Sequence, residues 1–212
     1  NRLGNPQLLP VTRVRRWQEE MVCKTPYGEK AMDVAMPMFH LGFKCEPLPN
    51  GDKGVYGEIV GDLAAEALFG ESSALYLKLY EEGVIDGSFG GGLETVDGMC
   101  MLTASGDSEQ PEALREAILR EAERIVREGV PEEDFLRMKR SALGRRIRDL
   151  DSFNSTCFRL CAYHFVGFDY MEFPRVFQDI REEEIREFLH RVVQRSRCCL
   201  SVILPEDQEV NT

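Results

Sequence analysis

Residues 67–91 constrain the fold more than any other segment, because they combine two helices, a corner and the start of a strand in the sequence ALFGESSALYLKLYEEGVIDGSFGG. Gly70 can adopt the left-handed backbone that ends a helix, and the side chain of Ser72 or Ser73 can accept a backbone N–H of the next one. Gly83 can end the second helix, just before the apolar pair Val84 and Ile85. The segment predicts a sharp helix–helix corner, a second helix of about three turns, and a strand.

The charge of the chain argues against two classes of partner. Its 212 residues carry 37 acidic and 26 basic side chains, a formal net charge of −11, which repels nucleic-acid backbones and anionic lipid surfaces. The sequence has no apolar run of about 18 residues that would cross a bilayer. We therefore expect neither a nucleic acid nor a membrane as a partner. One basic cluster is interpreted as a solvated helix face, namely Lys139, Arg140, Arg145, Arg146 and Arg148.

The positions of the cysteines and the composition of the N-terminal residues indicate the cellular compartment. Seven cysteines occupy scattered positions that do not form a disulfide framework, and the N-terminal residues lack the apolar core of a signal peptide. We expect a reducing, cytoplasmic location. The chain begins at Asn1, in a polar segment, which suggests a piece of a longer protein.

Hydrophobic periodicity predicts the remaining elements. Residues 30–44 alternate as a half-buried strand, with Met32, Val34 and Met36 on one face, and the Asp-Gly pair at 97–98 predicts a β-hairpin. Helices are predicted along an apolar face through Ile59, Leu63 and Ala67, from Pro111, from Pro131 and over residues 152–166. An aromatic loop is predicted around Phe168, Tyr170 and Phe173. It is followed by a helix capped by Asp179 and Glu182 and by a strand over residues 198–204.

This order of elements predicts the fold class and the domain division. Strands come first, helices lie between them and a strand comes last, which is typical of an α+β layer fold. We expect an antiparallel or mixed sheet with helices on one face. Residues 1–29, which are rich in proline, are predicted to form an arm or linker, and residues 30–212 a single domain.

Two clusters invite a chemical interpretation. Cys157, Cys161 and His164 are spaced so that one helical face would present all three, either as metal ligands or as a buried core face, since free cysteine behaves as a small hydrophobe. The aromatic and aliphatic residues around them favour the core face. The glycines at 90–92 follow a strand start and do not bridge a strand to a helix, so they do not indicate a phosphate-binding loop.

The corner at 70–75, with its pattern G-x-S-S-x-L, resembles the one found in insulinase-type zinc peptidases, which include pitrilysin and the mitochondrial processing peptidase. The resemblance continues through the hairpin, the long helix from Pro111 and the turn REGVPEEDFLRMKRSALG, and covers most of residues 30–205. Such peptidases bind zinc with H-x-x-E-H on a helix, which this chain lacks, because His40, His164 and His190 are isolated.

The resemblance implies a function for the chain. Insulinase-type peptidases pair two similar α+β halves into a clamshell; the first half usually carries zinc, and the second closes the chamber around an extended peptide. This chain looks like the second, metal-free half, with zinc and catalysis in an N-terminal half that is absent here. The implied partners are that catalytic half and a peptide substrate, with a homodimer as a further possibility. The alternative is a scaffold or protein-interaction module of the same fold, and an H-x-x-E-H motif in the upstream sequence would distinguish the two. An independent metal-binding protein is a third option.

The resemblance also implies candidate substrate contacts. The second half of active members often supplies an arginine from the second corner helix and a tyrosine seven residues later. Here Leu79 or Tyr80 falls at the first position and Asp86 at the second, so neither functional residue is retained. The following residues, Ser88 and Phe89, would approach the chamber and contact peptide backbone by strand addition. The competing interpretation is that Tyr80 and Phe89 pack between helix and sheet.

Overall fold

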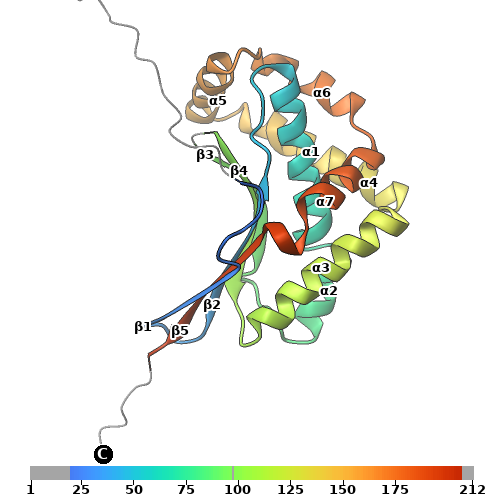
Figure 1. The fold of residues 1–212 in the computed structure, drawn as a ribbon. Coiled ribbons are helices and arrows are strands. Elements are labelled where there is room, and N and C mark those ends of the chain that lie inside the picture. The colour runs from blue at the N-terminus through green and yellow to red at the C-terminus, as the bar shows by residue number, and fades with distance from the viewer. Residues whose placement is uncertain (1–19, 97, 207–212) are drawn as a thin grey trace, which may run out of the picture.

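Helices cover one face of a mixed sheet (Figure 1) in the computed structural model, which describes residues 20–96 and 98–206. The strands are β1 (Tyr27–Met32), β2 (Met38–Cys45), β3 (Gly90–Val96), β4 (Met99–Asp107) and β5 (Cys198–Pro205). The α-helices are α1 (Asp52–Phe69), α2 (Ala74–Glu81), α3 (Pro111–Glu128), α4 (Glu132–Asp149), α5 (Phe153–Phe165), α6 (Phe173–Asp179) and α7 (Glu182–Val192), with short 3₁₀ turns η1 (Tyr170–Glu172) and η2 (Arg195–Arg197). The predicted α+β class, with helices on one face of a mixed sheet, is confirmed.

The central strand of the sheet is β2. In the order β1-β5-β2-β4-β3, it pairs antiparallel with both β4 and β5, while β1 runs parallel to β5. Alternate residues Phe39, Leu41 and Phe43 are buried in the core, and His40 between them is exposed. This alternation places the apolar side chains on the helix-covered face and leaves the other face of the sheet without a helical layer in the described residues.

The corner between α1 and α2 forms as predicted, by a different backbone geometry. Gly70 is extended, with φ −60° and ψ 147°, and is not left-handed; glycine is needed because a Cβ there would lie 2.5 Å from the Glu66 carbonyl oxygen. Ser73 caps α2: its hydroxyl accepts from the Tyr76 N–H and donates to the Leu68 carbonyl oxygen. The second helix has 8 residues, about two turns and not three.

The hairpin and three helix starts are confirmed. β3 and β4 flank the Asp-Gly turn, α3 begins at Pro111 and ends before Gly129, whose φ is 81°, and Pro131 immediately precedes α4. Ser152 caps α5 by accepting the Ser155 N–H. These termini follow from local backbone chemistry, which is why they could be read from the sequence.

Two predictions about the elements are wrong. Residues 30–44 are not one strand, because β1 ends at Met32 and β2 begins only after Pro37, so Val34 and Met36 lie in the connection. The aromatic loop contains α6, with a proline in its first turn and Phe173 and Phe177 buried. The structure places β1 across the predicted division at residue 30, and residues 1–19 of the predicted arm lie outside the described residues.

The predicted cap of α7 is also wrong by two residues. Glu184, not Glu182, accepts the backbone N–H at the helix start, which comes from Arg181 at 2.9 Å and not from Asp179. Glu182 instead accepts the Val130 N–H at 2.8 Å and so ties the loop between α3 and α4 to α7. Glu182 and Glu184 look equivalent in the sequence, and the tertiary contact of Glu182 with Val130 leaves Glu184 to cap the helix.

Two adjacent glycines of β3, Gly91 and Gly92, should respond differently to substitution. A Cβ at Gly91 would lie 2.5 Å from the Phe69 ring and from the Thr103 carbonyl oxygen, whereas a Cβ at Gly92 would meet open space. Gly91→Val should therefore destabilise the domain by about 1–3 kcal/mol through overpacking, and Gly92→Val should be neutral or stabilising. Urea unfolding of both variants checks this; equal losses would show that β3 does not lie against α1 in the described way.

Candidate functional site

The four predicted substrate contacts lie at the end of α2 and in the turn before β3. Tyr80 is 56% exposed and stacks on Tyr76, with ring centroids 5.8 Å apart. Asp86 accepts both the backbone N–H and the hydroxyl of Ser88, and these bonds lower the pKa of the Asp86 carboxyl. The Ser88 hydroxyl in turn accepts the Asp107 N–H, which fastens the turn to β4. Tyr80, Asp86 and Ser88 are open to solvent.

Phe89 has a different environment. It is 5% exposed, and its ring lies about 6 Å from those of Phe39, Phe69 and Tyr76. This aromatic cluster joins β2, α1 and α2 to the start of β3. Phe89 therefore holds the β3 start in place from within the core.

The strand that follows is an edge of the sheet. β3 pairs only with β4 among the described strands, so its outer backbone N–H and C=O groups have no strand partner there. Gly92 faces open space. An unpaired edge of this kind can accept an extended peptide as an added strand.

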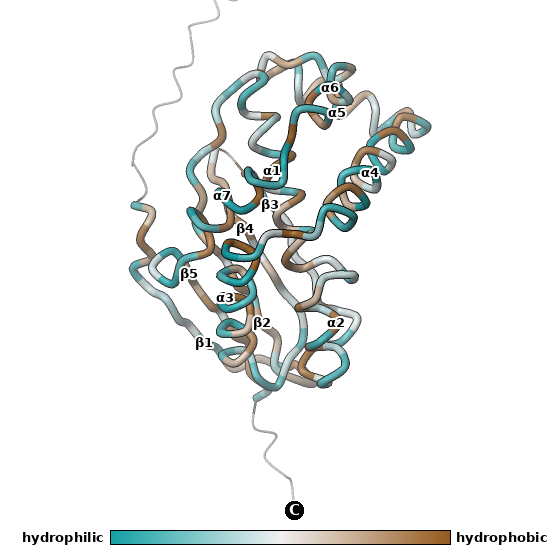
Figure 2. The backbone as a smooth tube through the Cα atoms, turned by 90° about the vertical axis from the view of Figure 1, so that its right-hand side faces the viewer, coloured by the Kyte–Doolittle hydropathy of each residue, from teal (hydrophilic) through white to brown (hydrophobic). Residues whose placement is uncertain are grey.

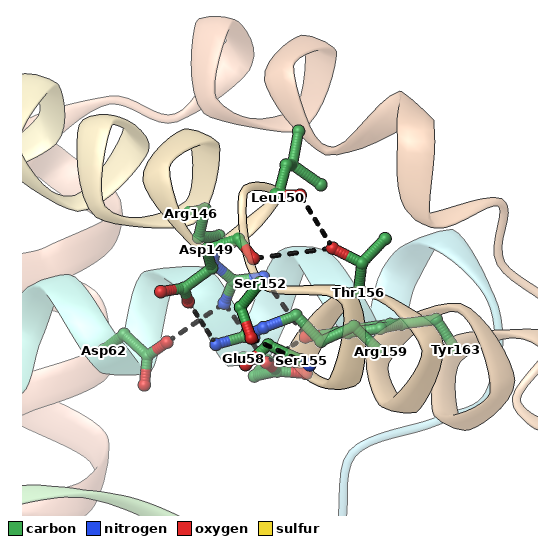
Figure 3. A network of polar contacts seen from close by, with 10 residues as sticks. All are labelled: Glu58, Asp62, Arg146, Asp149, Leu150, Ser152, Ser155, Thr156, Arg159 and Tyr163. Atoms are coloured by element: carbon green, nitrogen blue, oxygen red, sulfur yellow. Dashed lines mark hydrogen bonds and ion pairs between the residues drawn. The ribbon is translucent and has the colours of Figure 1, made fainter.

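A buried arginine beside this edge was missed by the sequence analysis (Figure 3). The Arg146 guanidinium donates to Glu58 and Asp62 of α1, at 3.2 Å each, and to the Tyr163 hydroxyl of α5, at 3.1 Å. The Tyr163 hydroxyl donates to Glu58 at 2.5 Å, and burial raises the pKa of this tyrosine to about 12. The network joins α1, α4 and α5 through one side chain that is 9% exposed.

Two further ion pairs surround it. Arg145 pairs with Glu66 at 3.3 Å and Arg159 with Asp149 at 2.8 Å. Arg146 is thus not part of a solvated helix face as predicted, because it fills the interior of a charged cluster. A signal was present in the sequence: Glu58 and Asp62 are four residues apart on a helix whose neighbours Ile59 and Leu63 are apolar.

The network lines a cavity of about 560 Å³ that reaches the edge strand. Gly91 and Gly92 form one wall, α1 contributes acidic side chains, and α4 and α5 contribute arginines. Burial raises the pKa of the Asp62 carboxyl to about 6, although the charge of Arg146 acts in the opposite direction. We call this cavity the charged cleft.

The predicted cysteine–histidine cluster is placed differently. Cys157, Cys161 and His164 are all exposed on α5, so the prediction of a buried core face is wrong for this domain. Within the part of the chain that the structure describes, no three His, Cys, Asp or Glu side chains are arranged to hold a metal ion. No helix of that part is long and apolar enough to cross a membrane.

Comparison with known proteins now identifies the family. A family model described as "Peptidase M16 inactive domain" matches residues 9–142, well over half of the chain. This chain belongs to the M16 peptidase inactive-domain family. The resemblance to insulinase-type peptidases is thereby confirmed.

Individual relatives agree with this membership. The chain is 27% identical over 183 residues to the "Uncharacterized zinc protease YmfH" of Bacillus subtilis (strain 168), covering 84% of this chain and 42% of the relative. Its fold is similar to that of a putative M16-like peptidase from Alicyclobacillus acidocaldarius, with a TM-score of 0.82 and 22% identity over 88% of this chain and 45% of the other. An inactive peptidase domain of a putative zinc protease from Bordetella parapertussis is covered to 99% and matches 85% of this chain, with a TM-score of 0.67 and 17% identity.

The three relatives differ in how much of their own length this domain covers. The M16 inactive domain described here spans less than half the length of the Bacillus and Alicyclobacillus proteins, and nearly all of the Bordetella domain. Each of the two longer proteins therefore contains a further segment about as long as this domain.

Loss of Arg146 should weaken the domain strongly. Arg146→Met leaves Glu58 and Asp62 facing each other without a cation, and we expect a loss of about 3 kcal/mol in the free energy of unfolding, at the low end for a broken buried ion pair because Asp62 keeps solvent contact. Arg148→Met, at an exposed position of the same helix, should change it by less than about 0.5 kcal/mol. Urea unfolding measures both. Adding Glu58→Gln and Asp62→Asn to Arg146→Met should restore part of the loss; a further loss would contradict the electrostatic explanation.

Asp62 should make stability depend on pH. Its pKa is about 6 in the folded domain, above the value of about 3.9 in an unfolded chain, so the folded state retains the proton longer. The stabilisation from this group is fully present below about pH 4 and is lost as the pH rises through about 6. Compared with Asp62→Asn, the natural domain should therefore lose unfolding free energy between about pH 4.5 and 7.5 in denaturant titrations. Parallel curves for the two proteins would refute the assignment.

Proposed function

We propose that this M16 inactive domain is the metal-free half of a zinc metallopeptidase, which forms the wall of a peptide chamber together with a catalytic half. The observation that carries the proposal is the unpaired edge of β3 next to the charged cleft, in a chain of the M16 inactive-domain family. Zinc would be bound by the catalytic half. The chain by itself is proposed to have no peptidase activity.

The edge of β3 supplies the proposed substrate contact. An extended peptide that adds to β3 gains main-chain hydrogen bonds without regard to its sequence, which suits a chamber that accepts unstructured peptides. The glycine at position 92 lets another backbone approach closely. Side chains of the peptide would lie over the charged cleft, where both signs of charge are available.

The sites predicted from the sequence take distinct roles in this proposal. Tyr80, with its exposed ring, and Asp86 and Ser88, in the exposed turn, contact the peptide beyond the start of β3. Phe89 is a positioning residue, because its buried ring fixes the strand to which the peptide adds. Seven free thiols support the cytoplasm as the proposed location.

Zinc-dependent cleavage by the intact parent protein, or by this chain mixed with its separately produced catalytic half, tests the proposal. A panel of unstructured peptides should be cleaved only when both halves are present, and a chelator should abolish the activity. A stable but zinc-free and inactive pair would refute the peptidase and favour a scaffold of the same fold.

A substitution at Tyr80 tests the substrate contact separately. Tyr80→Ala in the active pair should lower kcat/KM by about fivefold, since an exposed aromatic contact contributes on the order of 1 kcal/mol, and loss of its stacking on Tyr76 should lower the unfolding free energy by no more than about 1 kcal/mol. Leu77→Ala on the same helix, equally exposed at 57%, is the matched control and should leave kcat/KM unchanged. Equal effects of the two substitutions would remove Tyr80 from the substrate site.

A further inference from the structure

The outer face of α5 carries the most exposed phenylalanine and tyrosine side chains of the described residues. Phe153, Phe158 and Phe165 are 81%, 74% and 84% exposed. Cys157 and Cys161 lie between them on the helix surface and are also exposed. We call these five residues the α5 outer face.

The five residues of this face are uncharged, and the exposed polar residues Asn154 and His164 lie among them on the same side of the helix. The only Asp, Glu, Lys or Arg side chain within α5 is Arg159, which is paired with Asp149. With roughly 200 Å² per phenylalanine side chain, the three exposed rings present on the order of 500 Å². That is more than half of the surface of about 800 Å² that one partner contributes to a stable protein interface.

Weak attachment of α5 does not explain the exposure. The inner side of the helix is held by Tyr163, which is buried, donates to Glu58 and stacks on Tyr170 with centroids 5.1 Å apart. A solvated helix would present polar side chains outward, yet here the sequence pattern of a buried face is turned to solvent. The pattern therefore fits a face that another protein covers.

A second observation lies at the same end of the molecule. A hollow of about 700 Å³ opens beside Leu160 and Phe165, and Tyr170 lines it. Within the described part of the chain, the Tyr170 hydroxyl is the one buried side-chain oxygen or nitrogen without a hydrogen-bond partner. An unsatisfied buried polar atom costs about 1–3 kcal/mol of folding free energy, so this end of the isolated domain lacks a stabilising hydrogen bond.

We propose that the α5 outer face is the surface on which the catalytic half of the parent protein docks. The inference rests on the proposed function and adds the location of the contact. A metal site in the partner must reach a peptide bound at β3, so the partner has to sit next to the charged cleft. α5 borders this cleft through Arg159, which lies on the inner side of the helix with Tyr163, and Gly91 of β3 lines the same cleft. The extra length of the Bacillus and Alicyclobacillus relatives is sufficient for such a partner.

The chemistry of the face specifies its partner. The complementary surface should be aliphatic or aromatic and uncharged at its centre, since an unpaired charge buried against three phenylalanines would be costly. A second copy of this domain would join two metal-free domains and leave the cleft without a metal site.

Thiol protection tests the contact without any substitution. In this chain alone, Cys157 and Cys161 should react rapidly with N-ethylmaleimide, while the buried Cys45, Cys100 and Cys198 should not. In the complex with the separately produced catalytic half, isolated by size-exclusion chromatography, the rates at Cys157 and Cys161 should fall at least about tenfold. A complex in which both thiols react at the free rate would overturn the proposed contact and leave the proposed function intact.

Substitution provides the second measurement. Phe158→Glu with Phe165→Glu should weaken binding to the catalytic half by about 100-fold or more, as expected for two central aromatic contacts. Leu77→Glu on α2 is the control: it is also exposed, it lies at the opposite end of the helical layer (Figures 1 and 2), and binding should be unchanged. Circular dichroism confirms that each variant is folded.

Three other outcomes would overturn the inference in different ways. If this chain alone forms a dimer that protects Cys157 and Cys161 and that Phe158→Glu with Phe165→Glu dissociates, the face binds a second copy. If the two halves form no complex at all, the proposed function fails and the docking surface fails with it. If they form a complex that the double substitution does not weaken, only the docking surface is wrong.

Discussion

The close approach of α1 to the edge of the sheet determines where every other functional feature lies. At Gly61, a Cβ would meet the Leu93 side chain at 2.6 Å, and at Gly91 it would meet the Phe69 ring at 2.5 Å, so glycine on each side allows the helix to lie directly against β3. This packing fixes the rotation of α1 about its axis. It buries Ile59 and Leu63 and turns Glu58 and Asp62 toward α4, which creates the acidic wall of the charged cleft.

The arginine network follows from that rotation. Two carboxylates on a helix that packs against a sheet need a cation, and Arg146 supplies one while its planar guanidinium also bonds to Tyr163. A buried ion pair of this kind adds little net stability compared with an apolar core, but it disfavours other arrangements because each partner is costly to leave unpaired. The network thus sets the positions of α4 and α5 relative to α1, and with them the mouth of the cleft.

On the outer side of α5, the sequence has the apolar pattern of a buried face, but this side of the helix is exposed in the isolated domain. The inner side of α5 is held by the buried Tyr163, whereas three phenylalanines are exposed to solvent. One face of α5 therefore packs within the domain, and we propose that the other face packs against a partner in an assembly. On that proposal, the assembly is connected to substrate binding because α5 and β3 line the same charged cleft.

The sequence by itself determined the elements whose ends depend on backbone chemistry. Pro111 and Pro131 begin helices, Gly129 ends one, Ser73 and Ser152 cap two more, and the Asp-Gly pair closes a hairpin, because each effect acts within about one turn of chain. Apolar periodicity indicated much of the core, and the G-x-S-S-x-L corner carried the resemblance to the family.

Only the tertiary structure decided which charges are interior and which apolar faces are exposed. Arg146 resembles its basic neighbours in the sequence and differs only because Glu58 and Asp62, more than 80 residues away, meet it across the cleft. Glu182 and Glu184 are likewise distinguished by the distant Val130 N–H. Phe158 has the sequence pattern of a core residue and is nevertheless exposed. For the charged residues the deciding partner is remote in the chain, and for Phe158 we propose that it lies in another protein segment, so no local pattern could have revealed it.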